Sequence, residues 1–268
     1  MASRLSTPSS IEITIQHGVG VIWMTRPAVR NAIDDVVIAE LTRAFADLDR
    51  DKMVRAVVLA GQGPAFCAGA DLNWVKRTAG NTKQAHERDG KALAKMLLTL
   101  DQLSKPTIAR IHGAAVGAGV ALAAACDIVV AGTSATFSMR EVRLGLVPFA
   151  VAPFVVRAIG THLARRFALT GETILAAEAY RIGLAHELVQ DELLDGAVNE
   201  MLGHLIQGGP EAIARTKQLL RDLDGKPITG PLLAKAAKDF AVVQASAEAR
   251  EGMQSFLARG NPSWHRGT

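Results

Sequence analysis

The sequence predicts an α/β fold with a mostly helical C-terminal region. Two continuous apolar runs, residues 56–60 and 107–111, are typical of strands that are buried on both faces of a sheet. Apolar residues recur at helical spacing over residues 91–103, just before the second run. Because strand, helix and strand follow one another along the chain, we expect the two strands to pair in parallel. From Pro210 onward the patterns are those of long helices.

The start of the chain predicts a hairpin followed by a helix. Residues 11–15 alternate apolar with polar side chains, and residues 19–24 continue as a second apolar run after a His-Gly pair, which indicates an antiparallel hairpin. Apolar positions at spacings of three and four then predict an amphipathic helix that starts near Ile33 and ends near Asp49. Its charged face is expected to point to solvent.

A third unit follows the second buried strand. The Gly-rich residues 113–119 lead into an Ala-rich helix over residues 120–126, and residues 128–131 form the next strand. Two further helices, residues 161–169 and 176–181, are each followed after two positions by a glycine that fits a helix C-cap. The strands and helices up to this point belong to one α/β core.

These patterns divide the chain into three expected parts. Residues 1–10 form a flexible N-terminus, residues 11–195 the α/β core, and residues 196–268 a helical C-terminal region. The first ten residues lack the apolar stretch of a secretory signal, so we expect a cytoplasmic protein. No linker-like tract or internal repeat separates the parts.

Composition excludes several classes of protein. With 49% hydrophobic and 21% charged residues and a net charge of +4, the chain is an ordinary globular protein, neither disordered nor fibrous. Cys67 and Cys126 are too few for a disulfide framework, and Asp127 interrupts the most apolar stretch, which argues against a membrane span. No histidines stand at metal-ligand spacing, and no phosphate-binding loop or serine-nucleophile motif occurs. We therefore expect neither a metal nor a redox cofactor.

Two Gly/Ala-rich turns are the candidate functional feature. FCAGAD (residues 66–71) and HGAAVGAG (residues 112–119) each follow a buried strand and lead toward a helix. Small residues let a ligand approach the main chain, and a helix N-terminus leaves amide groups directed at negative charge. The two turns together can bind one oxyanion. The alternative is that the glycines serve only tight turns and close packing.

Six segments in a fixed order carry a family resemblance. They are RPAVRNAI (26–33), FCAGADLNW (66–74), KPTIARIHGAAVGAGVALAAACDIVVA (105–131), REVRLGLVP (140–148), LTG (169–171) and SAEAREGMQSFLARGNPSW (246–264). From about Glu12 to Trp264 the chain resembles the crotonase, or enoyl-CoA hydratase/isomerase, family. The resemblance implies a crotonase-like spiral of ββα units with a helical C-terminal trimerisation region, in trimers that often pair into hexamers.

The resemblance implies an oxyanion hole for an acyl-CoA thioester carbonyl. The family's two main-chain donors correspond to Ala70 in the first turn and Ala118 in the second, with Gly117 beside it. Preorganised donors stabilise the enolate-like state of an enoyl thioester, and one such donor is worth about 10²–10³ in rate. Ala118 replaces the middle of three family glycines, which is tolerable if its φ is negative.

The expected acid/base machinery is reduced to one carboxylate. Most hydratases of the family use two glutamates. Here the position of the first is Ala121, which is expected to contact substrate but carries no carboxylate, and the position of the second is Glu141. A single glutamate can shuttle a proton between two carbons, or polarise a water and deliver its proton in one concerted step. In a mostly apolar pocket its pKa would rise. The alternative for Glu141 is a surface residue paired with a neighbouring arginine.

Two segments, GADLNWVKR (69–77) and EVRLGLVPFAVAPFVVRAIG (141–160), are most similar to bacterial methylglutaconyl-CoA hydratases of leucine degradation and their isohexenylglutaconyl-CoA relatives. Because those substrates carry a distal carboxylate, Arg140 is the candidate to bind it, or else a solvated neighbour. By resemblance, the main chain from Ala68 to Leu72 contacts coenzyme A, and Arg30 is a candidate contact of its phosphates. Asp71 in that turn is expected to cap the following helix. Coenzyme A enters as part of the substrate, without a separate cofactor.

The leading hypothesis is therefore an enoyl-CoA hydratase for a branched, carboxylated substrate. Its alternative is a Δ3-Δ2 enoyl-CoA isomerase that uses Glu141 alone. RNA binding, which some eukaryotic members of the methylglutaconyl group show, is disfavoured because aromatic residues make up only 4% of the chain. A non-catalytic oligomer that binds acyl-CoA is the remaining alternative. In an oligomer, Phe256 and the C-terminal helix are candidates to close a neighbour's pocket.

Overall fold

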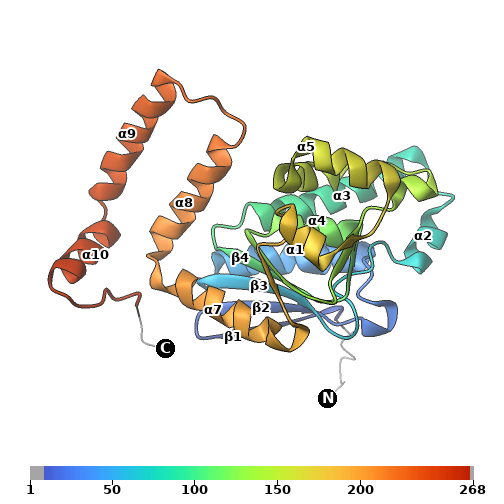
Figure 1. The fold of residues 1–268 in the computed structure, drawn as a ribbon, viewed down its shortest axis with the longest axis horizontal. Helices are drawn as coiled ribbons and strands as arrows, with labels where there is room; N and C mark the ends of the chain where they lie inside the picture. The colour runs from blue at the N-terminus through green and yellow to red at the C-terminus, as the bar shows by residue number, and fades with distance from the viewer. Residues whose placement is uncertain (1–8, 266–268) are drawn as a thin grey trace, which may run out of the picture.

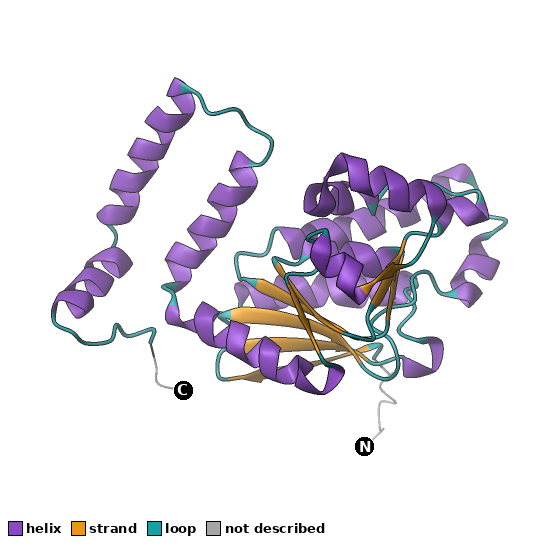
Figure 2. Ribbon diagram, viewed as in Figure 1, coloured by secondary structure: helices purple, strands orange, loops and turns teal. Residues whose placement is uncertain are grey.

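The chain folds into an α/β body and a helical arm that projects from it (Figure 1). The computed structural model describes residues 9–265, so the predicted flexible N-terminus at residues 1–10 lies almost entirely outside them. Figure 2 shows that the strands lie in the body, whereas the arm is helical throughout. The predicted fold class is confirmed.

A six-stranded sheet forms the centre of the body. Its order is β1-β2-β3-β4-β6-β9, with bounds Ile11–Gln16, Val19–Met24, Ala56–Gly61, Thr107–Ile111, Ile128–Gly132 and Glu187–Val189. The first two strands are antiparallel, as the predicted hairpin requires, and the remaining neighbours are parallel. The predicted parallel pairing of β3 with β4 is therefore confirmed.

Both faces of the sheet are covered at its centre, and β3 shows how. Its side chains are all buried. Val57 and Leu59 belong to the main core, which also contains residues of helices α1 (Asp35–Arg50), α3 (Lys83–Asp101), α4 (Ala118–Ala125) and α5 (Ala152–Thr170). Ala56 and Val58 face the opposite side and pack with α7 (Leu194–Gln207). This alternation follows from the two-residue period of a strand, and it explains why the run is continuously apolar.

Several elements differ from the predicted bounds. The helix predicted for residues 91–103 begins earlier, at Lys83. The prediction missed its first two turns because they face solvent and have no apolar pattern. The helix predicted for residues 161–169 begins at Ala152 and includes Gly160 at φ 73°, which interrupts its helical geometry. A second, small sheet was not predicted at all, since its strands are only two or three residues long; they are β5 (Ala114–Val116), β7 (Thr136–Ser138) and β8 (Ile174–Leu175).

Short helices connect the larger elements. They are η1 (Pro27–Val29), α2 (Leu72–Thr78), η2 (Glu141–Leu144), α6 (Ala176–Arg181) and η3 (Asp191–Leu193). The helix predicted for residues 176–181 matches α6. The two Gly/Ala-rich turns connect β3 to α2 and β4 to α4, so both lead into a helix, as predicted.

The arm consists of α8 (Pro210–Leu223), α9 (Gly230–Gln244) and α10 (Ala247–Leu257). None of these helices has a buried residue, whereas α7 buries one face against the sheet. The predicted boundary at residue 195 therefore falls inside α7, and the chain leaves the body only after Gln207. The sequence showed helices in this region but not which of them pack on the body.

Candidate active site

The two Gly/Ala-rich turns lie side by side. The Cys67 N–H donates to the Ala114 carbonyl, and the Val116 N–H donates to the Cys67 carbonyl, at 3.0 and 2.9 Å. Gly69, at φ 86°, packs so closely over this ladder that a Cβ would lie 2.9 Å from the Val116 carbonyl oxygen. Gly119 packs against Cys67 in the same way. The glycines thus serve close packing, and that packing is what joins the turns.

Each turn presents main-chain amides without a backbone acceptor, among them those of Ala70 and Ala118. The bonds of Ile33 N–H to the Gly69 carbonyl and of Asp71 N–H to the Ile33 carbonyl fix the chain on both sides of Ala70. Within residues 9–265, neither the Ala70 N–H nor the Ala118 N–H donates to another group of the chain. Ala118 opens α4 and is not among the residues with positive φ, so its substitution for glycine introduces no strain. The arrangement supplies two donors for an oxyanion.

Gly117 brings Glu141 to the start of α4. Its N–H donates to the Ser138 carbonyl at 2.9 Å, which continues the β5–β7 pairing, and Glu141 follows three residues later in η2. A Cβ on Gly117 would lie 3.0 Å from the Glu141 Oε1. The carboxylate therefore rests on the backbone immediately before Ala118. The dihedrals of Gly117, φ 52° and ψ −112°, are available in practice only to glycine.

The Glu141 carboxylate is half-buried, and one of its oxygens lacks a partner. Its Oε2 is buried without a hydrogen-bond partner in the described part of the chain. Burial raises the pKa of the carboxyl, partly opposed by its own backbone N–H. Neither neighbouring arginine pairs with it, because Arg140 donates to Thr173 and Arg143 to the Thr170 carbonyl. The alternative of a surface glutamate paired with an arginine is therefore wrong.

Asp71 caps α2, as predicted. Its Oδ1 accepts the N–H groups of Asn73 and Trp74 at 2.8 and 3.3 Å, and its Oδ2 forms an ion pair with Arg26 at 2.8 Å. Burial alone would raise the pKa of this carboxyl, but the two amides and the guanidinium lower it overall. Asp71 therefore stays ionised and holds the turn. The next residue, Leu72, is the first of α2, and its side chain is exposed.

Three further residues were predicted to contact substrate: Arg30, Ala121 and Arg140. Arg30 is exposed, and its carbonyl accepts the N–H of Ala68, so it borders the first turn. Ala121, in contrast, has no exposed surface and belongs to the main core. Its predicted contact with substrate is therefore wrong in this structure, because the side chain on α4 points into the packed interior. The exposed Arg140 donates to Thr173 Oγ1 at 3.0 Å, and its role as a carboxylate ligand stays a prediction.

Cys67 and His112 are held in structural contacts. Burial raises the pKa of the Cys67 thiol to about 12, so it is protonated at neutral pH and a poor nucleophile. The His112 ring lies 2.7 Å from the Gly63 carbonyl oxygen and 3.2 Å from Arg110 Nη1. Within residues 9–265, no group of three or more His, Cys, Asp or Glu side chains is arranged to hold a metal ion.

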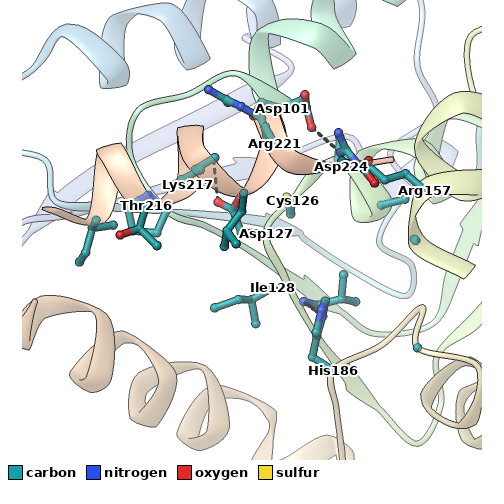
Figure 3. A pocket seen from close by; sticks show the side chains of 18 of the residues that line it. Asp101, Cys126, Asp127, Ile128, Arg157, His186, Thr216, Lys217, Arg221 and Asp224 are labelled. Carbon is teal, nitrogen blue, oxygen red and sulfur yellow. Dashed lines mark hydrogen bonds and ion pairs between the residues drawn. The ribbon is translucent and has the colours of Figure 1, made fainter. Parts of the chain in front are cut away.

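A large cavity at the opposite end of α4 was not predicted. Its volume is about 820 Å³, and it lies between α8 and the body, where Figure 3 shows the Lys217–Asp127 and Arg157–Asp101 pairs. Neither of the two unpaired amides nor Glu141 lines it. The residues at the C-terminal end of α4, such as Cys126, do. Size alone therefore does not identify the site where chemistry is expected.

In the described residues, no helix has the length and apolar character needed to span a bilayer.

Comparison with known proteins identifies the family. The model of the enoyl-CoA hydratase/isomerase family matches residues 14–267. A putative enoyl-CoA hydratase of Thermus thermophilus is 32% identical over 93% of this chain and 99% of its own. The 2,3-dehydroadipyl-CoA hydratase of Escherichia coli is 30% identical over 96% of this chain and 98% of its own. A crystal structure of a putative enoyl-CoA hydratase/isomerase (crotonase) of Legionella pneumophila is 36% identical, with TM-score 0.92 over 97% and 100% of the two chains.

The fold and the paired turns thus define an enzyme of the acyl-CoA-processing type. The chain belongs to the crotonase, or enoyl-CoA hydratase/isomerase, family. It is an enoyl-CoA hydratase or isomerase, and its substrate is an acyl-CoA thioester.

Proposed function

We propose that the protein is a hydratase for a branched, carboxylated 2-enoyl-CoA of the methylglutaconyl-CoA type. One observation carries the chemical part of this proposal: a half-buried carboxylate with an unpaired oxygen lies on the backbone turn that presents a free amide. An acid/base group and an electrophilic site are thereby held next to each other, as hydration of a conjugated thioester requires. Glu141 is the acid/base, and Ala70 and Ala118 supply the electrophilic amides.

The two amides stabilise charge on the thioester oxygen. When a nucleophile adds to C3 of a 2-enoyl thioester, negative charge develops on the carbonyl oxygen. Main-chain donors of Ala70 and Ala118 bind that oxygen more strongly as the charge grows. Because Ala118 opens α4, the partial positive charge of the helix N-terminus adds to this effect.

Glu141 transfers the proton. The carboxylate accepts one proton from a water whose oxygen forms the new bond to C3, and the carboxyl then delivers a proton to C2. One water O–H bond and the C2–C3 π bond are broken, and C3–O and C2–H bonds are formed, so H₂O is added across the double bond and Glu141 ends unchanged. A carboxyl whose pKa is raised by burial suits both halves of this exchange. Coenzyme A takes part only as the carrier of the acyl group, and the scheme uses no further cofactor.

The carboxylated substrate is supported by a relative and by a nearby cation. The name of the Escherichia coli relative specifies a 2,3-dehydroadipyl group, which is derived from a dicarboxylic acid. Arg140 precedes Glu141 and is exposed, and the bond to Thr173 uses only one of its five donors. The remaining donors are available for a distal carboxylate.

An oligomer of three or six copies is part of the proposal. The arm helices α8, α9 and α10 have no buried residue, and Phe256 is 81% exposed. Large apolar side chains left exposed over a whole helical arm favour association with another copy. We expect the arm of one copy to lie against a neighbour in a homotrimer or homohexamer.

A Δ3-Δ2 enoyl-CoA isomerase is the second candidate. The observation that favours it is that Asp71, the carboxylate in the first turn, is bound to Arg26 and two amides, which leaves Glu141 as the acid/base. One carboxyl is sufficient to move a proton between two carbons of the same substrate.

A panel of thioesters tests the proposal. Branched and unbranched 2-enoyl-CoA and 3-enoyl-CoA thioesters, with and without a terminal carboxylate, are incubated with the wild type, Glu141→Gln and the exposed-residue control Glu192→Gln. We expect 3-hydroxyacyl-CoA to form fastest from the branched, carboxylated 2-enoyl-CoA and to be lost only in Glu141→Gln. Double-bond migration without hydration would favour the isomerase, and no turnover of any thioester would refute both.

A further inference from the structure

We propose that Arg140 and Arg143 are positioning residues that clamp the turn carrying Glu141 onto the C-terminal end of α5. The inference rests on the proposed function, in which the Glu141 carboxyl transfers the proton. It concerns how that carboxyl is held, and it assigns to both arginines a role that does not depend on the substrate's distal group.

The two arginines flank Glu141 and reach the same four-residue stretch. Arg140 Nη2 donates to Thr173 Oγ1 at 3.0 Å, and Arg143 Nη2 donates to the Thr170 carbonyl at 3.3 Å. Gly171 lies between these acceptors in a left-handed conformation, φ 60°. A Cβ at Gly171 would lie 2.9 Å from Arg143 Nε, so the guanidinium is packed directly on its backbone.

The turn needs such a clamp because it is not held by burial. The 3-10 helix η2 has no buried residue, and it is only four residues long. Its own hydrogen bonds, from Leu146 N–H to the Glu141 carbonyl and from Gly145 N–H to the Val142 carbonyl, close the turn but do not attach it to the body. The two guanidinium bonds attach it, since their acceptors belong to the end of α5 and the residues after it.

The electrostatics at the end of α5 favour this arrangement. The last carbonyl groups of a helix carry partial negative charge, which attracts the Arg143 guanidinium. Two further charged groups at this end, Arg166 and Glu172, form an ion pair at 2.8 Å. Arg140 and Arg143 therefore point their charge at α5, and the Glu141 carboxyl is left without a cationic partner.

The experiment compares Arg140→Met, Arg143→Met and Thr173→Val with Arg165→Met, an exposed arginine of α5 that makes no hydrogen bond or ion pair in the described chain. Because small displacements of a catalytic group are costly, we expect each clamp variant to lower kcat about fivefold to tenfold for carboxylated and uncarboxylated thioesters alike. KM should change less than about twofold in Arg143→Met and Thr173→Val, which leave the Arg140 guanidinium in place, and Arg143→Lys should restore part of kcat.

The pH profile gives a readout that a merely structural role would not move. A loosened turn hydrates the Glu141 carboxyl, so the apparent pKa in kcat/KM should fall in Thr173→Val, which keeps both guanidinium groups, and stay unchanged in Arg165→Met. Burial raises the pKa of this carboxyl and its own backbone N–H opposes the rise, without a contribution from a charged group. The charged side chains around the clamp are Arg140, Arg143 and the Arg166–Glu172 pair, and that pair is unchanged in every variant. Melting curves confirm that each variant is folded.

Hydrogen exchange tests the clamp without relying on activity. The amides of residues 141–147 should exchange about fivefold faster or more in Arg143→Met and Thr173→Val than in the wild type and Arg165→Met. Unchanged exchange in these variants overturns the clamp, even if the wild type turns over no thioester and the proposed function fails. An unchanged kcat in both Arg140→Met and Thr173→Val, with only KM for carboxylated substrates raised in Arg140→Met, also overturns the clamp and leaves Arg140 as a substrate ligand alone.

Discussion

The two ends of α4 differ in whether their polar groups have partners, and this difference separates a candidate catalytic site from a cavity. At its N-terminal end, Ala118 offers an unpaired amide, and the Glu141 carboxylate lies beside it with a buried oxygen that has no partner. At its C-terminal end lies a cavity of about 820 Å³, in which Lys217 and Asp127 are paired with each other. At the N-terminal end, polar groups of the site have no hydrogen-bond partner, whereas Lys217 and Asp127 at the cavity bind each other.

This difference has an energetic meaning. A buried polar group without a partner costs free energy, so a fold keeps one only where something else is gained, such as a substrate contact. A buried ion pair needs no ligand to account for it. The comparison predicts that changes at the N-terminal end of α4 affect turnover, and that changes at the C-terminal end affect stability.

The largest effect is expected from Glu141→Gln. The amide keeps the shape of the side chain but neither accepts nor delivers the proton, so kcat should fall by about 10²–10⁴. KM should change little, because the amides that bind the thioester oxygen are untouched. Steady-state kinetics with the best thioester of the panel checks this, and Glu192→Gln is the matched control. A loss below tenfold would remove Glu141 from the mechanism.

Gly117→Ala tests whether the position next to the Glu141 carboxylate must lack a side chain. The added Cβ would lie 3.0 Å from Glu141 Oε1, and φ 52° is strained for alanine. We expect kcat to fall by about tenfold to a hundredfold through displacement of the carboxyl. Gly203→Ala in α7, where a Cβ meets nothing within 4 Å, is the control and should keep wild-type kcat. Equal kinetics of both variants would contradict the proposed placement of Glu141.

The sequence predicted the body better than the connections. The strand β3 and the parallel pairing were predictable because a buried strand imposes a continuous apolar run. The start of α3 at Lys83 was not, because solvent-exposed turns leave no pattern. Nor were β5 and its partners, since strands of two or three residues are too short to show a period.

The site divides in the same way. The turns with Ala70 and Ala118 were predictable because glycine spacing marks the backbone, and the position of Glu141 came from family resemblance. The partner of Arg140 was not predictable, because Thr173 lies 33 residues away and is brought close only by the path of α5. Ala121 was misassigned, since the sequence alone did not show that its side chain is buried in the core.

Lys217→Met tests the other end of α4. The Lys217 side chain is 8% exposed, and its Nζ donates to Asp127 and to the Lys105 carbonyl at 2.6 and 3.0 Å. Removing it leaves two acceptors with one partner fewer, which should lower the free energy of unfolding by about 2 kcal/mol. Denaturant unfolding measures this, and kcat should stay within about twofold. Arg215→Met, an exposed residue on the same helix, should change neither quantity; a tenfold loss of kcat in Lys217→Met would end the contrast between the two ends.

The smallest effect is a pH-dependent gain of stability in Glu141→Gln. Burial raises the pKa of the folded carboxyl above its ordinary value of 4.5, so the stability that this group contributes is fully present below that value and is lost as the pH rises through the folded pKa. At pH 8 the wild type bears a half-buried unpaired charge that glutamine lacks. Glu141→Gln should therefore melt about 2 °C higher than the wild type at pH 8, and the difference should vanish near pH 4.

The same melting experiment includes its own control. Glu192→Gln removes an exposed charge, so its difference in Tm from the wild type should be small and nearly the same at both pH values. If Glu141→Gln gained no stability at pH 8, the carboxylate would be solvated or paired in solution. The contrast between an unsatisfied N-terminal end and a satisfied C-terminal end of α4 would then disappear, because the free energy cost that marks the site would be absent.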